Sequence, residues 1–167
     1  MRPALRSWMP VLAVLATLAC KTRVDVEPPE PAASSATAAP VRLLVASAPP
    51  AGDVASEVRE ASATAAAEKR RLIVYVGAEW CEPCKRFRAA AESGELDAMF
   101  GGLTLFAFDS DRDSERLKAA GYVSRYIPLF ALPAADGTAS GKQIEGGIKG
   151  VRAVAEIAPR LRVLLAQ

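Results

Sequence analysis

The sequence contains no histidine and only three cysteines among its 167 residues. Without an imidazole there can be no Ser-His or Cys-His catalytic pair and no histidine ligand for a metal ion. Three thiols are also too few for a four-cysteine zinc site. The sequence therefore predicts an active site without a metal.

An excess of charge of one sign is also missing. The 21 Lys and Arg residues nearly balance the 19 Asp and Glu residues, which leaves a formal net charge of +2 at pH 7. Because nucleic-acid binding needs a strong positive field, we expect no nucleic-acid partner. The length suits one compact domain better than two, and the hydrophobic content of 51% argues against a wholly disordered chain.

The N-terminal region has no hydrophobic run long enough to cross a bilayer. Residues 8–19 are uncharged and apolar, but a spanning helix needs ~20 such residues. Arg2 and Arg6 precede this run and Cys20 follows it, which is the layout of a secretory signal. We expect residues 1–19 to be a signal peptide and the rest of the chain to lie outside the cytoplasm, where disulfides can form.

Cys20 stands directly after the apolar run and resembles the lipidated cysteine of bacterial lipoprotein signals. Ala19 fits that signal, whereas Thr17 stands where it usually has leucine. We expect Cys20 to be lipidated and to attach the protein to the periplasmic face of a bacterial cell envelope. Two alternatives remain open: ordinary cleavage that leaves Cys20 as a free thiol, and an uncleaved anchor.

The remaining chain divides into a linker and a packed domain. Residues 20–40 are rich in Pro, Ala, Ser and Thr and contain no aromatic residue, so we expect a disordered linker there. Nine of the ten aromatic residues lie from Tyr75 onward, and every isoleucine lies from Ile73 onward. The packed domain is therefore expected over residues 41–167.

Within 41–167 the residue pattern predicts the order β-α-β-α-β-α-β-β-α, an α/β fold with a central mixed sheet flanked by helices. Five phenylalanines are expected in its core: Phe87, Phe100, Phe106, Phe108 and Phe130. The expected strands are 41–45, 72–76, 103–108, 129–132 and 142–145. The expected helices are 53–70, a stretch opened by 80–84 that ends near 92, and 110–120. A short turn of helix capped by Ser93 is expected after the second of these. The last helix is expected over 151–165, with Val151 on its apolar face.

The motif Cys81-Glu82-Pro83-Cys84 carries the strongest chemical signal, since it lies between a buried strand and a helix. At a helix N-terminus the unpaired N–H groups and the dipole stabilise a thiolate, which makes Cys81 the expected nucleophile. Cys84 lies about one turn further on and is the expected resolving thiol. Pro83 is tolerated in the first turn, where its missing N–H has no acceptor.

Other interpretations of this motif are weaker. Half of a zinc site would need a second cysteine pair or histidines, which the sequence lacks. A purely structural disulfide across four residues would constrain almost no chain. The charges near Cys81 are mixed and leave the sign of their combined effect on its pKa open: Lys85, Arg86 and Arg88 against Glu79 and Glu82.

Residues 72–85 (LIVYVGAEWCEPCK) resemble the active-site strand and helix of the thioredoxin superfamily. Ile127-Pro128 sits where that family has its cis-proline, and the resemblance spans about 41–167. The stretch 87–100, with its Ser93-Gly94 break, is most similar to the thioredoxin-like domains of periplasmic thiol-disulfide interchange proteins. The resemblance implies a thioredoxin fold. No organic cofactor is expected, because the dithiol itself carries the electrons.

The resemblance also implies roles for residues around the motif. Trp80 would shield the disulfide. Pro128, if cis, would face the nucleophile and leave the backbone of Ile127 available to an extended substrate. Gly146 or Gly147 would take the place of a family glycine near the substrate groove, or else serve as an ordinary turn glycine. Three residues near the proline are expected to be solvated or to touch a partner: Tyr122, Arg125 and Tyr126.

Three positions depart from the family pattern. Tyr75 stands where thioredoxin has a buried aspartate, and Leu105 stands at about the place of its partner lysine. We therefore expect slower attack by Cys84, with water or an exposed carboxylate accepting its proton. Gly77 replaces a bulky aromatic residue and is expected to widen the floor below Trp80.

Together these features predict an extracytoplasmic thiol-disulfide oxidoreductase that acts on protein disulfides through Cys81 and Cys84. Reduction is the favoured direction because Pro83 and Ile127-Pro128 resemble reductive members of the family. Oxidation or isomerisation stays open, as does a binding module without turnover. The expected partners are protein thiols or disulfides and an unidentified redox partner, with the chain itself a monomer.

Overall fold

The computed structural model describes residues 41–167, which form one five-stranded sheet with helices on both faces. The predictions for residues 1–40, including the signal peptide, the linker and Cys20, lie outside the described residues. Within 41–167 no helix is both long and apolar enough to cross a membrane. The elements are β1 (Leu44–Ser47), α1 (Val54–Ala67), β2 (Arg71–Gly77), α2 (Glu82–Ser93), α3 (Asp97–Phe100), β3 (Leu103–Asp109), α4 (Ser110–Ala119), β4 (Leu129–Pro133), β5 (Ala139–Glu145) and α5 (Ala153–Leu165).

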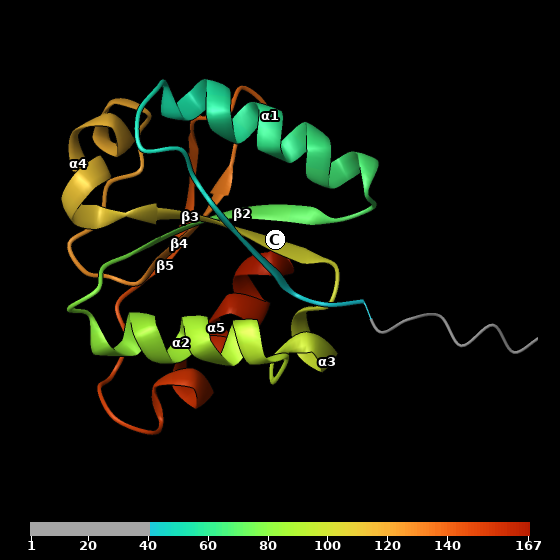
Figure 1. The fold of residues 1–167 in the computed structure, drawn as a ribbon, viewed down its shortest axis with the longest axis vertical. Helices are drawn as coiled ribbons and strands as arrows, with labels where there is room; N and C mark the ends of the chain where they lie inside the picture. The colour runs from blue at the N-terminus through green and yellow to red at the C-terminus, as the bar shows by residue number, and fades with distance from the viewer. Residues whose placement is uncertain (1–40) are drawn as a thin grey trace, which may run out of the picture. The chain divides into compact units, whose positions relative to one another are not determined.

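The strands lie in the order β1-β3-β2-β4-β5. β1, β3 and β2 are parallel, whereas β4 runs antiparallel to β2 and β5 antiparallel to β4. Helices α1 and α4 cover one face of the sheet, and α2, α3 and α5 lie on the other (Figure 1). This mixed sheet between two helical layers confirms the predicted fold class, and the short helix α3 is the expected turn of helix after residue 93.

β2 is the central strand and is buried on both faces, as its continuous apolar run predicts. It pairs with β3 along its whole length and with β4 over residues 74–76. Ile73 and Tyr75 point into the core beneath α2 and α5, while Val74 and Val76 point into the core beneath α1 and α4. The expected core phenylalanines are all buried: Phe87, Phe100, Phe106, Phe108 and Phe130.

Two predicted helix boundaries are wrong. Ser93 does not cap a following helix; it is the last residue of α2, and its hydroxyl donates a hydrogen bond to the Ala90 carbonyl at 3.1 Å. Gly94 ends that helix in the left-handed conformation, with φ of 85°. Val151 precedes α5 and is 84% exposed, so the apolar face of the last helix begins at the buried Ala153.

The outer strands also differ from the expected ranges. β1 starts at Leu44 because the Leu43 N–H donates to the Asp97 carboxylate, at 2.8 Å, instead of to a strand. β5 reaches back to Ala139 and pairs there with Pro133, across a register shift in the β4–β5 ladder. Both strands are sheet edges.

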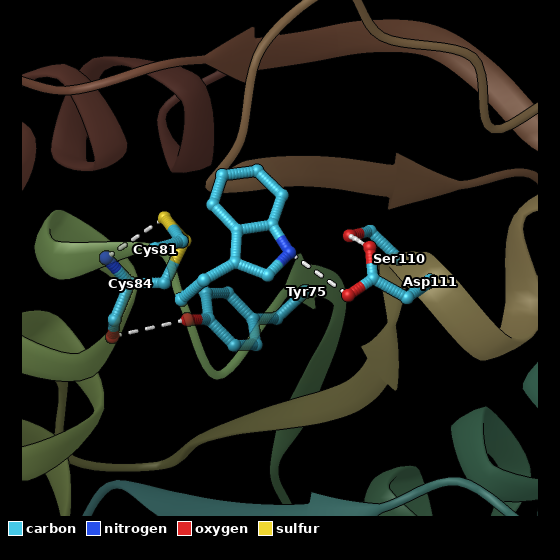
Figure 2. The surroundings of a disulfide bond; sticks show 6 residues. Tyr75, Cys81, Cys84, Ser110 and Asp111 are labelled. Carbon is cyan, nitrogen blue, oxygen red and sulfur yellow. Dashed lines mark hydrogen bonds between the residues drawn. A yellow bond between two sulfur atoms is a disulfide. The ribbon is translucent and has the colours of Figure 1, made fainter.

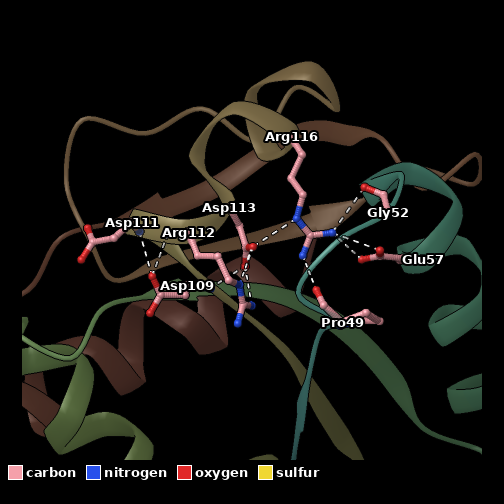
Figure 3. Close-up of polar contacts among 8 residues, drawn as sticks. All are labelled: Pro49, Gly52, Glu57, Asp109, Asp111, Arg112, Asp113 and Arg116. Carbon is pink, nitrogen blue, oxygen red and sulfur yellow. Dashed lines mark hydrogen bonds and ion pairs between the residues drawn. The ribbon is translucent and has the colours of Figure 1, made fainter.

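Helix α4 is held by a buried ion network centred on Asp113, whose side chain is fully buried (Figure 3). Its carboxylate accepts hydrogen bonds from the Asp109 N–H at 2.9 Å, from Arg112 at 2.8 Å and from Arg116 at 3.1 Å. Arg116 also pairs with Glu57 of α1 at 2.9 Å. Arg116 also donates to two carbonyls of the β1–α1 connection, those of Pro49 and Gly52. The network therefore ties α4 to α1 and to the end of β3.

The Asp113 carboxylate stays ionised within this network. Burial alone would raise its pKa, but the hydrogen bonds from Arg112, from the Asp109 N–H and from Arg116 outweigh burial. The pKa of Asp113 therefore lies below its ordinary value. A group of this kind stabilises the fold above its unfolded pKa, and the stabilisation is lost as the pH falls through the folded pKa.

Replacing Asp113 with asparagine should destabilise the domain by about 3–5 kcal/mol at pH ~7, because two guanidinium groups lose their buried partner. Urea unfolding of wild type and Asp113→Asn measures the difference. The gap should shrink at pH ~3, below the pKa of an aspartate in the unfolded chain, because the unfolded wild type then binds a proton that the folded carboxylate does not. The exposed Glu95→Gln variant serves as the control and should stay within about 0.5 kcal/mol of wild type. An Asp113→Asn loss that is equal at both pH values would contradict the proposed ionic contribution.

Candidate redox site

The motif cysteines lie where the end of the central strand meets a helix. Cys81 is the N-cap of α2, with extended backbone, and Cys84 lies in its first turn. The two form a disulfide whose Cα atoms are 5.2 Å apart, and Cys81 Sγ accepts a hydrogen bond from the Cys84 N–H at 3.3 Å (Figure 2). The structure thus brings both predicted site residues together at the helix N-terminus.

This position favours a thiolate on Cys81 once the disulfide is opened. The Cys84 N–H already points at Cys81 Sγ, and helix N-termini stabilise negative charge. Both cysteines are less than a tenth exposed, and Pro83 between them is also buried. The sulfur atoms are thereby largely shielded from solvent.

The charged side chains around the motif are mostly paired with each other. Arg86 Nε lies 2.9 Å from Glu82 Oε1, and Arg88 pairs with Glu92 at 2.7 Å. The Arg86 hydrogen bond, followed by one from the Gly150 N–H, holds the pKa of Glu82 below its ordinary value. Glu82 therefore keeps a negative charge beside Cys81, where it opposes the effect of the helix N-terminus.

Tyr75 lies beneath the resolving cysteine (Figure 2). Its hydroxyl donates a hydrogen bond to the Cys84 carbonyl at 3.1 Å, and its ring packs 5.2 Å from that of Phe130. Burial raises the pKa of Tyr75 far above its ordinary value. The phenol is therefore neutral at physiological pH and serves as a hydrogen-bond donor, not as a base for Cys84.

Gly77 leaves room for the Tyr75 hydroxyl. A Cβ on Gly77 would lie 2.7 Å from Tyr75 Oη, closer than van der Waals contact permits. The prediction that Gly77 widens the floor below Trp80 is therefore wrong, because the Tyr75 hydroxyl fills the space. On β3 the residue paired with Tyr75 is Ala107, and Leu105 lies in the same apolar core. Neither of these β3 positions offers Tyr75 a charge.

A cavity of about 220 Å³ leads from Tyr75 and Cys84 toward a polar rim. Two carboxylates, Glu79 and Asp109, line it. Three cations complete the rim: Lys85, Arg88 and Arg112. Of these two carboxylates Glu79 is exposed, as the prediction requires, whereas Asp109 is half-buried and caps α4.

A groove of about 450 Å³ adjoins the motif and is lined by Trp80, Tyr126 and Ile127. Trp80 is 68% exposed and Tyr126 is 62% exposed, so both present aromatic surface to a partner. The indole N–H of Trp80 donates to the Asp111 carboxylate at 2.8 Å (Figure 2). Asp111 was not expected at the site, because only the fold brings the start of α4 to the end of β2.

The Ile127–Pro128 peptide bond is cis, and the Pro128 carbonyl accepts a hydrogen bond from the Gly146 N–H at 2.9 Å. Pro128 itself is buried, while Ile127 is partly exposed. Tyr122 differs from expectation: it is buried, and its hydroxyl donates to the Gly137 carbonyl at 2.8 Å. It is part of the core beneath α4, whereas Arg125 and Tyr126 are exposed.

Residues 53–135 match the family model described as thioredoxin-like. The chain contains a thioredoxin-superfamily domain. No curated protein sequence matches the chain. Within residues 41–167 no cluster of three or more acidic or cysteine side chains could hold a metal ion. The thioredoxin-like domain, together with the Cys81–Cys84 disulfide, supports thiol-disulfide oxidoreductase activity.

Solved thioredoxins resemble the thioredoxin-like domain at low identity. Oxidised thioredoxin O1 from Arabidopsis thaliana is 17% identical, with a TM-score of 0.44, and covers 75% of this chain and 96% of its own. Chloroplastic thioredoxin z is 18% identical, with a TM-score of 0.43, and covers 76% and 97%.

Introducing an acid beneath the thiol of this thioredoxin-like domain should speed its resolving step. In Tyr75→Asp a carboxylate replaces the neutral phenol. A positioned base typically speeds a proton transfer by ~100-fold or more. Stopped-flow measurement of disulfide reduction between pH ~6 and ~9 tests this. Tyr75→Phe is the control, since it removes the hydroxyl without adding a base. Equal rates for wild type and Tyr75→Asp across that range would contradict the expected role of the missing acid.

Proposed function

We propose that the protein is an extracytoplasmic thiol-disulfide oxidoreductase that reduces disulfides in protein substrates. The observation that carries the proposal is the Cys81–Cys84 disulfide at the N-terminus of α2, in a thioredoxin-like domain. The groove beside Trp80 adds a surface suited to a polypeptide partner, because its exposed members include the aromatic Trp80 and Tyr126 and the apolar Val123 beside polar and charged side chains. We further propose that the protein acts as a monomer.

The proposed reaction starts from the dithiol form. The Cys81 thiolate attacks one sulfur of a substrate disulfide, so a mixed disulfide forms and one substrate thiolate leaves. Cys84 then loses its proton and attacks Cys81 Sγ, which releases the second substrate thiol. Two electrons have passed to the substrate, and the protein is left as the observed disulfide. A dithiol partner must reduce it again before the next cycle.

The surrounding residues fit distinct parts of this reaction. The Cys84 N–H favours the attacking thiolate on Cys81. The cavity with Glu79 and Asp109 offers an exit for the Cys84 proton, either to water or to a carboxylate. Trp80 and the Ile127–Pro128 segment would bind the substrate chain beside the disulfide.

Two features of the motif favour reduction as the direction. Pro83 and the cis-bonded Ile127–Pro128 resemble reductive members of the superfamily. The ionised Glu82 lies next to Cys81, and a negative charge there disfavours the thiolate and hence favours the disulfide. A protein whose disulfide is more stable relative to its dithiol has a lower reduction potential, so its dithiol is a better electron donor.

The proposed location rests on residues 1–20 of the sequence. The short apolar run and Cys20 would direct export and lipid attachment, with residues 20–40 as a spacer between the lipid and the domain. The protein would then act at the periplasmic face of a bacterial envelope, as the periplasmic thiol-disulfide interchange proteins that it resembles do.

Insulin reduction with dithiothreitol as the electron source tests the activity. Wild type should accelerate precipitation of the reduced chains, Cys81→Ser should be inactive, and Cys84→Ser should stall as a mixed disulfide that is visible on a non-reducing gel. Titration against glutathione gives the reduction potential of the Cys81–Cys84 pair. A value of about −270 mV supports reduction, and one of about −120 mV favours oxidation. Substrate binding without turnover in wild type would leave the binding-module interpretation in place of the enzyme.

Lipid attachment is tested in bacterial cells that express the full chain with labelled palmitate in the medium. Wild type should incorporate label and sediment with membranes, whereas Cys20→Ser should do neither, because its serine offers no thiol for the lipid. Cys84→Ser serves as the matched control and should be labelled like wild type. Labelling of Cys20→Ser, or unlabelled wild type, would contradict the anchor.

A further inference from the structure

The loop of residues 146–150, between β5 and α5, is attached at its start to the proline segment. The Gly146 N–H donates to the Pro128 carbonyl at 2.9 Å. Arg160 of α5 donates to the Gly146 carbonyl at 3.1 Å and to the Glu145 carbonyl at 2.7 Å. The first residue of the loop is therefore fixed by contacts from two sides.

The middle of this loop packs directly on the redox motif. A Cβ on Gly147 would lie 3.0 Å from Ile157 Cδ1 and 3.3 Å from Pro83 Cβ, which is tighter than ordinary contact. A side chain here would press on Ile157 and Pro83, because the loop backbone lies against Pro83, between the two cysteines. The loop thus spans the distance from Pro128 to the motif.

Glu82 holds the far end of the loop. Its Oε1 accepts a hydrogen bond from the Gly150 N–H at 3.2 Å and another from Arg86 Nε at 2.9 Å. Glu82 is the residue directly after Cys81, and its side chain is 38% exposed. Arg86 holds the carboxylate on the helix surface, and the carboxylate in turn holds Gly150.

The loop also adds to the surface that a partner would meet. Gly146 lies against Tyr126, an exposed member of the groove beside the disulfide. Ile148 of the loop is 43% exposed, and Val151, the residue that follows the loop, is 84% exposed, so both present apolar surface to solvent. A loop fixed in place can offer these side chains without an additional ordering cost when a polypeptide binds.

We propose that Glu82 is a positioning residue that determines selectivity for polypeptide disulfides over small ones. Its carboxylate fixes the loop of residues 146–150 against the redox motif, and the fixed loop completes the surface that binds a substrate chain. A small disulfide reaches Cys81 without using that surface. The selectivity rests on the proposed function, whereas the contact between Glu82 and Gly150 does not.

Glu82 has two effects that can be separated by substitution. Its negative charge beside Cys81 acts on the thiolate and changes the rate with every disulfide. The hydrogen bond that its side chain accepts from the Gly150 N–H acts on the loop alone. Glu82→Gln keeps the length and an oxygen acceptor but loses the charge, while Glu82→Asp keeps the charge but is one methylene too short. Asp also suits the first turn of a helix, so this variant should fold.

The experiment measures kcat/KM for insulin and for a small aromatic disulfide in wild type, Glu82→Asp, Glu82→Gln and Arg86→Gln. The ratio of the two values cancels any change in thiolate reactivity. It should fall about fivefold or more in Glu82→Asp and stay near the wild-type ratio in Glu82→Gln. Arg86→Gln removes the donor that holds the carboxylate on the helix surface but keeps the reach of Glu82 to the Gly150 N–H, so it should weaken the hold on the loop only in part. Its ratio should remain closer to wild type than that of Glu82→Asp.

Hydrogen exchange of the Gly150 amide, followed by NMR in the oxidised protein, tests the contact without any activity. The Gly150 N–H should exchange about tenfold faster in Glu82→Asp than in Glu82→Gln. Equal exchange in these two variants would overturn the positioning role. A selectivity ratio that falls equally in both would overturn it too, because the charge and not the reach would then be responsible. If wild type reduced no disulfide, the proposed function would fail, and the exchange rates would still decide the contact.

Discussion

The pairing of β2 between β3 and β4 is the constraint on which the site depends. Seven residues of β2 pair in parallel with β3, and the antiparallel β4 closes the other side. The pairing of β2 fixes where the chain leaves the sheet, after Gly77. Helix α2 begins a few residues later, with Cys81 as its N-cap. β4 in turn begins directly after the cis-bonded Pro128. The disulfide and the proline segment are therefore held by adjacent strands of one rigid sheet.

Tyr75 and Gly77 show how this site stays packed without the buried acid of thioredoxin. They are two residues apart on one strand and so lie on the same face. The phenol fills the space beside Gly77 and donates to the backbone of Cys84. At this place a neutral phenol with one internal hydrogen bond therefore stands where thioredoxin has an ionisable carboxylate. In the proposed reaction the proton of Cys84 would leave through the cavity that Glu79 and Asp109 line.

Patterns local in the sequence predicted most of the fold and the two cysteines. The apolar run of β2, the motif at a helix start and the proline before β4 each depend on a few neighbouring residues. What could not be predicted depends on residues brought together from distant parts of the chain. The pairs Trp80–Asp111 and Glu82–Gly150 join different elements. Tyr122 was expected near solvent because only the tertiary structure supplies the Gly137 carbonyl that its hydroxyl contacts. Val151 fits the helical period, but the chain enters the helix two residues later.

The two edges of the sheet have a consequence for how the domain meets other chains. β1 is only four residues long, and β5 contains Gly141 in a left-handed conformation and an exposed Lys142. The β4–β5 ladder is irregular at Pro133. Short, kinked and charged edges are poor templates for another strand, which protects a protein against self-association through its sheet. Under the proposed function, extended polypeptides would therefore meet the domain at the face that carries the disulfide and would not pair with the edges of its sheet.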